Sequence, residues 1–402
     1  MKLRYKMTVG IILAILAAFA FGQAGSSRTL QYQPTGKTGV DETRLKKIDD
    51  AVAAEIQASH IPGAVVLVAR NGNVVFRKAY GNAQTVPQKE PLTPDRMFDM
   101  ASVTKPIATA TSVMMLVEEG RLRLTDKVTQ FIPEFTPFIS EKGDTTDVPT
   151  IAHLLTHTSG LPPYTNAAAL REKYGEPCPD QLIQIIAAIK KQSAPGEKYV
   201  YSCLGFITLG EIVRRVTGQN IAQFSSERIF KPLGMQSTMY CPPADLLARI
   251  VPTEVLNGKP LKGKVHDPLA QLLGGVSGNA GLFSTVDDLA IYCQMMLNGG
   301  TYGKAHILSP LTVGLMTTVY PDFAFSERSL GWGVNVSHYS LMGDLLPKTA
   351  FGHTGFTGTS VVIEPSTQTF IIILTNRVHL PDGDAGPLRA KVANIVAGSL
   401  TE

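Results

Sequence analysis

The sequence predicts an α/β protein in which a discontinuous antiparallel-sheet domain, flanked by helices, carries an inserted, mainly helical domain. Runs rich in β-branched residues, typical of strands, gather towards the two ends of the 402-residue chain: 63–70, 73–80, 331–336, 359–364 and 369–376. Between these groups, apolar helical patterns alternate with proline and glycine breaks. We therefore expect residues 41–100 and 286–402 to form the sheet domain and residues 101–285 to form the inserted domain.

The sheet domain is expected to open with an amphipathic helix and a hairpin. Over 42–59, apolar residues recur at the spacing of one helical face, and Asp41 can cap this helix. Asn71-Gly72 lies between the first two strand runs and is a strong signal for a tight hairpin turn. A last helix is expected over 387–397.

The first 24 residues are typical of a secretory signal peptide, with basic residues before an apolar run over 10–21 and small residues after it. This run is short for crossing a bilayer, and an uncleaved N-terminal anchor is the alternative. Residues 25–40 are expected to form a mobile leader. The sequence thus predicts export to the periplasm or the cell exterior, with no membrane span after signal cleavage.

Net charge and cysteine content bear on two further properties of the protein, its binding partners and its disulfide bonds. The net charge is +4 at pH 7, and three of the positive charges lie in the predicted signal, so no nucleic-acid partner is expected. One disulfide among Cys178, Cys203 and Cys241 is compatible with export, but the sequence chooses no pairing. Cys293 lies in an apolar helical pattern and is expected to be a buried thiol. The oligomeric state stays open.

Ser102 and Lys105 form the only S-x-x-K sequence in the chain. If Ser102 opens a helix in the inserted domain, residues three apart are neighbours, so Lys105 lies beside the hydroxyl. Serine becomes a good nucleophile when a nearby group, such as an amine of lowered pKa, takes its proton. Because a chain of this length contains about one such sequence by chance, a surface serine and lysine at a helix start is the alternative interpretation.

Two further segments favour the catalytic interpretation. Tyr201-Ser202-Cys203 precedes an apolar helical pattern, and His353-Thr354-Gly355 precedes a strand run. In this order the three segments resemble the S-x-x-K, Y-x-N and K-T-G signatures of the serine β-lactamase and penicillin-binding protein superfamily. The tyrosine points to its class C-like branch, which includes DD-peptidases and β-lactamase-fold esterases. Segments 153–162 and 278–285 also resemble stretches of that branch.

The resemblance implies a β-lactamase/transpeptidase-like fold and a serine hydrolase that works through an acyl-enzyme on Ser102. Lys105 or Tyr201 would take the serine proton. A free lysine and a free tyrosine are both mostly protonated at neutral pH, so the pKa of at least one of them must be lowered, and the sequence does not show which. The backbone N–H groups of Ser102 and Phe356 would hold the oxyanion. His353, with Thr354 and Gly355, would line the substrate site.

Two residues depart from the superfamily pattern. His353 replaces the commoner lysine, whose fixed charge holds a substrate carboxylate. With an ordinary pKa of about 6.5, histidine would bind a carboxylate more weakly and in a pH-dependent way. Cys203 replaces an asparagine that normally bonds the substrate amide and the lysine. A thiol is a poor donor, which argues against efficient β-lactam hydrolysis.

The leading prediction is an exported hydrolase of D-amino-acid peptides, similar to a DD-carboxypeptidase, with a small-molecule or peptidoglycan-peptide substrate and no cofactor. A carboxylesterase on the same fold is the first alternative. A weakly catalytic penicillin-binding or sensor protein, motivated by Cys203, is the second. No metal site is expected. His153 and His157 have the spacing of zinc ligands on a helix, but Leu154 stands where that motif needs glutamate.

Overall fold

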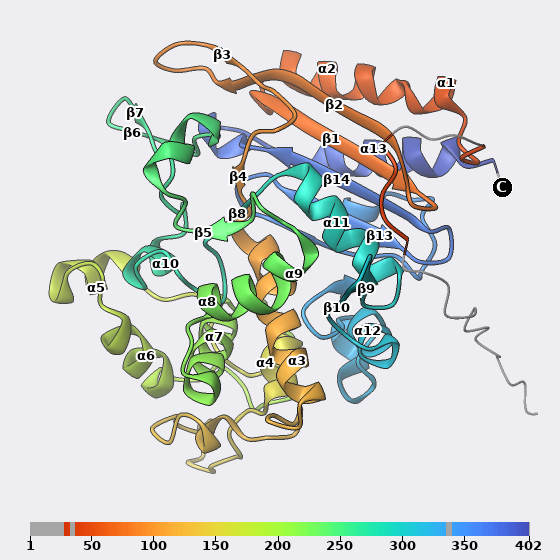
Figure 1. Ribbon diagram of the computed structural model, residues 1–402. Coiled ribbons are helices and arrows are strands. Elements are labelled where there is room, and N and C mark those ends of the chain that lie inside the picture. Colours follow the sequence, from red (N-terminus) through yellow and green to blue (C-terminus); the bar gives the residue numbers. More distant parts are fainter. Residues whose placement is uncertain (1–27, 33–36, 335–339, 402) are drawn as a thin grey trace, which may run out of the picture.

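The computed structural model describes residues 28–32, 37–334 and 340–401, and the predicted signal peptide lies outside them. Its centre is an antiparallel sheet with the strand order β11–β12–β13–β14–β1–β2–β3, covered by helices on both faces (Figure 1). The strands are β1 Gly63–Arg70, β2 Asn73–Gln84, β3 Glu90–Pro91, β11 Gly333–Val334, β12 Phe351–Thr354, β13 Ser360–Glu364 and β14 Thr369–Thr375. The predicted fold class is confirmed: strands from both ends of the sequence form one large antiparallel sheet, and helices flank it.

The two faces of the sheet bury separate apolar clusters, because successive residues of a strand point to opposite sides. In β1, Val65 and Leu67 belong to the cluster shared with the helical region, whereas Val66 and Val68 belong to the cluster on the other face. The elements that cover the sheet are α1 Glu42–Leu45, α2 Lys47–Gln57 and α13 Gly386–Ser399 on this second face, and α11 Val286–Leu297 on the first. Burial on both faces explains why β1 is apolar almost throughout.

The N-terminal elements form close to where they were predicted. Asp41 caps α1 by accepting two backbone N–H groups of its first turn, but the helix predicted over 42–59 is two helices that meet at Lys46. Asn71 and Gly72 form the predicted hairpin turn, with φ angles of 51° and 76°. Positive φ at both central residues is what a tight hairpin requires.

The C-terminal strands depart further from expectation. Strand β11 covers part of the run predicted over 331–336, whose last two residues lie outside the described ones. Strand β12, which carries His353, was not predicted, because its sequence Phe-Gly-His-Thr is short and lacks a β-branched run. It pairs with both β11 and β13 and so lies inside the sheet.

Most of the regular secondary structure between β3 and α11 is helical (Figure 1). Its helices are α3 Thr111–Glu118, α4 Ile151–Leu155, α5 Ala167–Tyr174, α6 Pro179–Ala188, α7 Cys203–Thr217, α8 Ile221–Ser225, α9 Lys231–Leu233 and α10 Pro268–Leu272, and α12 Pro310–Thr317 follows α11. In the described part of the chain, the short strands form three small sheets. One has the order β4 Phe98–Asp99, β8 Leu282–Ser284 and β5 Met239–Tyr240. The other two are the pairs β6 Val255–Leu256 with β7 Lys259–Pro260, and β9 Thr301–Tyr302 with β10 Ala305–His306. The boundaries of the inserted domain, 101–285, stay a prediction.

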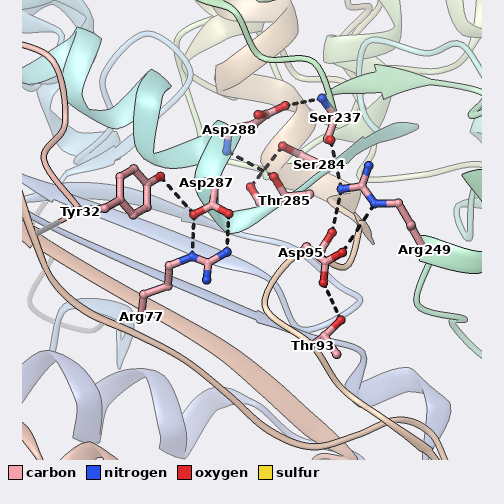
Figure 2. Close-up of polar contacts among 10 residues, drawn as sticks. All are labelled: Tyr32, Arg77, Thr93, Asp95, Ser237, Arg249, Ser284, Thr285, Asp287 and Asp288. Carbon is pink, nitrogen blue, oxygen red and sulfur yellow. Dashed lines mark hydrogen bonds and ion pairs between the residues drawn. The ribbon is translucent and has the colours of Figure 1, made fainter.

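The described part of the predicted mobile leader is anchored on the sheet domain. Leu30 is buried in the main apolar cluster. The hydroxyl of Tyr32 donates to Asp287 Oδ1 over 3.1 Å, and Arg77 donates to both oxygens of the same carboxylate over 2.7 and 2.6 Å (Figure 2). Asp287 lies in the first turn of α11, where the helix dipole also favours a negative charge. The Asp287 carboxylate therefore links the leader and β2 to α11.

The disulfide that the sequence left open does not form, because all four cysteines have free thiols. Cys293 is the buried thiol that the sequence predicted, and burial raises its pKa well above the ordinary value. Within the described ranges, we find no helix of the length and apolar character that a membrane span requires.

Ile372 in β14 tests how far the central sheet supports the fold. Its side chain is fully buried in the cluster between the sheet and the helical region. We expect Ile372→Ala to lower the free energy of unfolding by about 2–5 kcal/mol, because it removes apolar contacts and leaves a cavity. The measurement is urea unfolding followed by circular dichroism.

The matched control is Leu311→Ala, whose side chain is 79% exposed on α12 and should cost less than about 0.5 kcal/mol. Equal losses in the two variants would contradict the assignment of Ile372 to the core.

Candidate active site

Ser102 lies in a strained turn that opens a long helical segment. It belongs to the 3₁₀ turn Ala101–Val103, which runs through a wider turn at Lys105–Ala110 into α3. Ala101 has a φ of 46°, a left-handed conformation that is uncommon for a residue with a Cβ atom and is typical of functional sites. Ser102 therefore starts the helical segment, as the sequence predicted.

The carboxylate of Asp99 holds this turn in place. It accepts the Ala101 N–H over 2.8 Å and the His266 N–H over 2.7 Å. Burial raises the pKa of Asp99, and the two backbone N–H groups partly oppose that shift by favouring the ionised form. The side chain thereby links the strained turn to the segment before α10.

The turn between β12 and β13 packs directly on the serine turn. Thr357 Oγ1 donates to Asp99 O over 2.8 Å, and Thr359 Oγ1 donates to Met100 O over 3.0 Å. A Cβ atom on Gly355 would lie only 2.5 Å from Met100 O and 2.1 Å from Thr359 Oγ1. Only glycine allows this approach, which brings the predicted His-Thr-Gly segment beside Ser102.

Lys105 is fully buried, and its ammonium group has three acceptors. Nζ donates to Ser102 Oγ over 2.9 Å, to Asn279 O over 3.0 Å and to Cys203 Sγ over 3.5 Å. Burial lowers the pKa of Lys105, but the neighbouring Cys203 and Tyr201 raise it, and the net direction is upward. Lys105 is therefore a cation at neutral pH.

Tyr201 lies in the loop just before α7, with its ring beside Lys105. Nζ is 5.1 Å from the centre of the ring. Burial raises the pKa of Tyr201; Lys105 and Ser102 favour its ionised form and oppose this shift, but the net direction is upward. Among the described residues, the buried Tyr201 hydroxyl has no hydrogen bond of good geometry, although Ser102 and Lys105 lie near enough to act on its pKa.

His353 is buried and neutral, which corrects the expectation of a partly charged side chain. Its Nδ1 lies 2.8 Å from Thr354 O, and because a carbonyl only accepts, Nδ1 carries the proton and Nε2 is an acceptor. Burial, with Arg328 and Lys105 nearby, holds the pKa of His353 well below its ordinary value. A fixed positive charge, as lysine would supply, is therefore missing at this position.

The two remaining predicted residues lie at different depths. Cys203 is the first residue of α7, and its thiol contacts Lys105 rather than another cysteine. Phe356 is 61% exposed, with the His266 ring 5.6 Å and the Arg377 guanidinium 4.5 Å from the centre of its ring. The exposed ring of Phe356 thus lies on the surface, next to the packed His-Thr-Gly segment.

Sequence analysis missed several residues that surround the site. Arg328 donates to Tyr199 Oη over 2.7 Å, and its guanidinium lies 5.8 Å from the centre of the Tyr201 ring. Asn279 was noted within a family-like segment, but its role as an acceptor for Lys105 was not. These residues meet only through long-range folding, so their local sequence gives no signal. Over the described ranges, no group of three or more His, Cys, Asp or Glu residues is placed to hold a metal ion.

Known proteins support the resemblance inferred from the sequence. A family profile described as Beta-lactamase matches residues 48–394. A protein of Escherichia coli K12 named "Putative D-alanyl-D-alanine carboxypeptidase" is 32% identical over 406 aligned residues, covering 93% of this chain and 92% of its own. The N-acetylmuramyl-L-alanine amidase of Bacillus subtilis strain 168 is 32% identical over 364 residues, covering 84% of this chain and 82% of its own.

Solved structures share the fold at lower identity. The hydrolase EstCE1, described as having promiscuous acyltransferase activity, superposes with a TM-score of 0.71 at 24% identity, covering 89% of this chain and 99% of its own. An octameric penicillin-binding protein homologue from Pyrococcus abyssi gives 0.68 at 21% identity, covering 89% and 78%. With the profile match spanning both the sheet and the helical region, the chain belongs to the Beta-lactamase family of hydrolases.

Proposed function

We propose that this protein is a serine acyl-hydrolase in which Ser102 forms an acyl-enzyme intermediate. The observation that carries the proposal is the 2.9 Å contact between Ser102 Oγ and the buried Nζ of Lys105. An isolated surface serine and lysine would not bury an ammonium group, because burying a charge is costly unless acceptors compensate for lost water. The alternative of an incidental surface pair therefore has no support.

In the proposed reaction, Ser102 Oγ attacks the acyl carbon of the substrate. The pair of Lys105 and Tyr201 reacts in the form that has lost one proton, either a Tyr201 phenolate beside the Lys105 ammonium or a Tyr201 hydroxyl beside a neutral Lys105 amine. A bond forms between Oγ and the acyl carbon as the serine proton passes to this basic site, and the pair then protonates the leaving group as its bond to the acyl carbon breaks. Water then attacks the acyl-enzyme, loses a proton to the same pair, and releases the acid as Ser102 regains its proton. Because the two side chains are coupled, we assign the proton transfer to the pair.

The oxyanion is proposed to lie between the backbone N–H groups of Ser102 and Phe356. Two features of the structure favour this. Ser102 opens a helical segment, where free N–H groups and the helix dipole favour negative charge. The contact of Gly355 with Met100 and Thr359 keeps the segment that leads into Phe356 against the serine turn.

We propose amide bonds of peptidoglycan stem peptides as the leading substrate class. The names of the two relatives, "Putative D-alanyl-D-alanine carboxypeptidase" and "N-acetylmuramyl-L-alanine amidase", favour this class. The predicted signal over residues 1–24 favours it as well, because export would place the enzyme beside peptidoglycan.

Ester hydrolysis is the second candidate, and the neutral His353 favours it. A substrate that ends in a free carboxylate needs a positive partner, which a neutral imidazole does not provide. An uncharged ester has no such need. A non-catalytic sensor would keep the fold but form a slow or inert acyl-enzyme, which the first experiment below distinguishes.

Ser102→Ala should abolish covalent labelling of the purified protein by a fluorophosphonate, because the attacking oxygen is gone. Intact-mass spectrometry measures the adduct. The matched control is Ser112→Ala, which removes a buried hydroxyl that donates to Ala108 O and should leave labelling unchanged. Adducts that persist in the Ser102 variant would exclude it as the nucleophile, and an adduct that forms in the wild type without hydrolysis of any test substrate would favour the sensor.

Lys105→Ala and Tyr201→Phe should each slow acylation by roughly 10²–10⁴-fold, the range for loss of general acid–base catalysis. In the double variant the loss should be close to that of the larger single loss, because both side chains serve one proton transfer. Stopped-flow measurement of p-nitrophenyl acetate acylation gives the three rates. A double loss equal to the product of the single losses would show that the two act independently.

His353 should give no pH-dependent loss of activity between pH 6 and 8. Its pKa lies well below the ordinary value, so its cationic form is already lost at the acidic end of this window. His353→Lys should restore a positive charge and raise kcat/KM for a D-Ala-D-Ala peptide, relative to a neutral p-nitrophenyl ester, by about tenfold or more. The neutral His353→Gln variant should leave that ratio unchanged. A wild-type peptide activity that falls through pH 6.5 would contradict the neutral assignment.

A further inference from the structure

The two residues that flank Tyr201 both form hydrogen bonds with His157, which lies two residues after the end of α4. Val200 N–H donates to His157 O over 2.9 Å, and Ser202 N–H donates to His157 Nδ1 over 3.0 Å. His157 therefore holds the backbone on both sides of Tyr201, through its own carbonyl on one side and through its ring on the other.

The ring of His157 also packs on the aromatic side chains around it. Its centre lies 4.3 Å from that of Tyr201 and 5.1 Å from that of Phe206 in α7. His157 is buried, and its φ of 59° turns the chain out of the helical conformation at the end of α4. Such a backbone conformation is costly for a residue with a Cβ atom and is retained where the surrounding contacts require it.

The hydrogen bond from Ser202 fixes the tautomer of His157. An N–H group only donates, so Nδ1 accepts and the proton lies on Nε2, the reverse of the tautomer of His353. Burial and the charges of Arg328 and Lys105 hold the pKa of His157 well below its ordinary value, and His353 faces the same space. A protonated ring would have lost the acceptor that Ser202 needs.

We propose that His157 is the positioning residue that holds Tyr201 against Lys105 and Ser102. This inference rests on the proposed function. His157 would act through Tyr201, because its ring packs on the tyrosine ring and the structure, where described, shows no hydrogen bond between His157 and Ser102. Its loss should leave the Ser202 N–H without an acceptor and let the tyrosine ring move, which lowers kcat rather than raising KM.

His157→Asn and His157→Leu form the first comparison. Asparagine places its amide oxygen near the position of Nδ1 and tolerates positive φ, so it should keep kcat within about threefold of the wild type. Leucine offers no acceptor, and we expect it to lower kcat by about 10–100-fold while KM stays within about threefold. If the leucine variant does not fold, His157→Gln replaces it, because glutamine reaches the position of Nε2 and should behave like leucine.

His153→Asn is the matched control. It changes the other histidine of the same segment, whose Nδ1 contacts Thr150 and whose ring packs on Phe323. We expect its kcat to stay within about twofold of the wild type, because it makes no contact with Tyr201. Thermal unfolding of every variant separates loss of stability from loss of rate.

The decisive experiment repeats His157→Leu, or its glutamine substitute, in the Tyr201→Phe background. A residue that acts only by placing the tyrosine hydroxyl should cause less than a threefold further loss of acylation rate once that hydroxyl is absent. A loss as large as in the wild-type background would overturn the proposal and leave a general structural role. Because fluorophosphonate labelling of Ser102 tests the nucleophile separately, failure of the positioning role and failure of the proposed function are distinguishable.

Discussion

The candidate site depends on one constraint, the burial of the Lys105 ammonium away from water. A buried charge is tolerated only when acceptors replace its hydration. The acceptors come from three distant parts of the chain: Ser102 in the strained turn, Cys203 at the start of α7 and the carbonyl of Asn279 before β8. The Ser102 turn, the start of α7 and the loop before β8 must therefore all be folded before the Lys105 ammonium group can be buried.

This constraint also determines the electrostatics of the neighbouring histidines. Burial is the largest cause of the low pKa values of these histidines, and the charges of Arg328 and Lys105 add to it. His157 and His353 are thus neutral, and each is fixed by a backbone partner in a different tautomer. A site that already holds two buried cations takes histidine as a hydrogen-bonding group rather than as a charge.

The sequence could predict what local patterns determine. The strand runs of β1 and β2, the Asn71-Gly72 turn and the cap at Asp41 were all readable, and the order of three short motifs identified the family. It could not show β12, whose four residues lack a strand pattern, or the neutral state of His353. That state depends first on the burial of the ring and then on the nearby charge of Arg328, and both arise only through long-range folding. A disulfide was compatible with composition but not with the places that the cysteines take in the fold.

The pairing of β1 with β14 has a consequence for how the chain folds. Ala64 is paired with Thr375 and Arg70 with Thr369, so the middle of the sheet joins the two ends of the sequence. Such pairing carries a large loop-closure entropy and is slow to form. Until β14 arrives, β1 leaves one edge and two apolar faces open, which makes the incomplete chain prone to aggregation. The centre of the sheet can therefore close only after β14 has been synthesised.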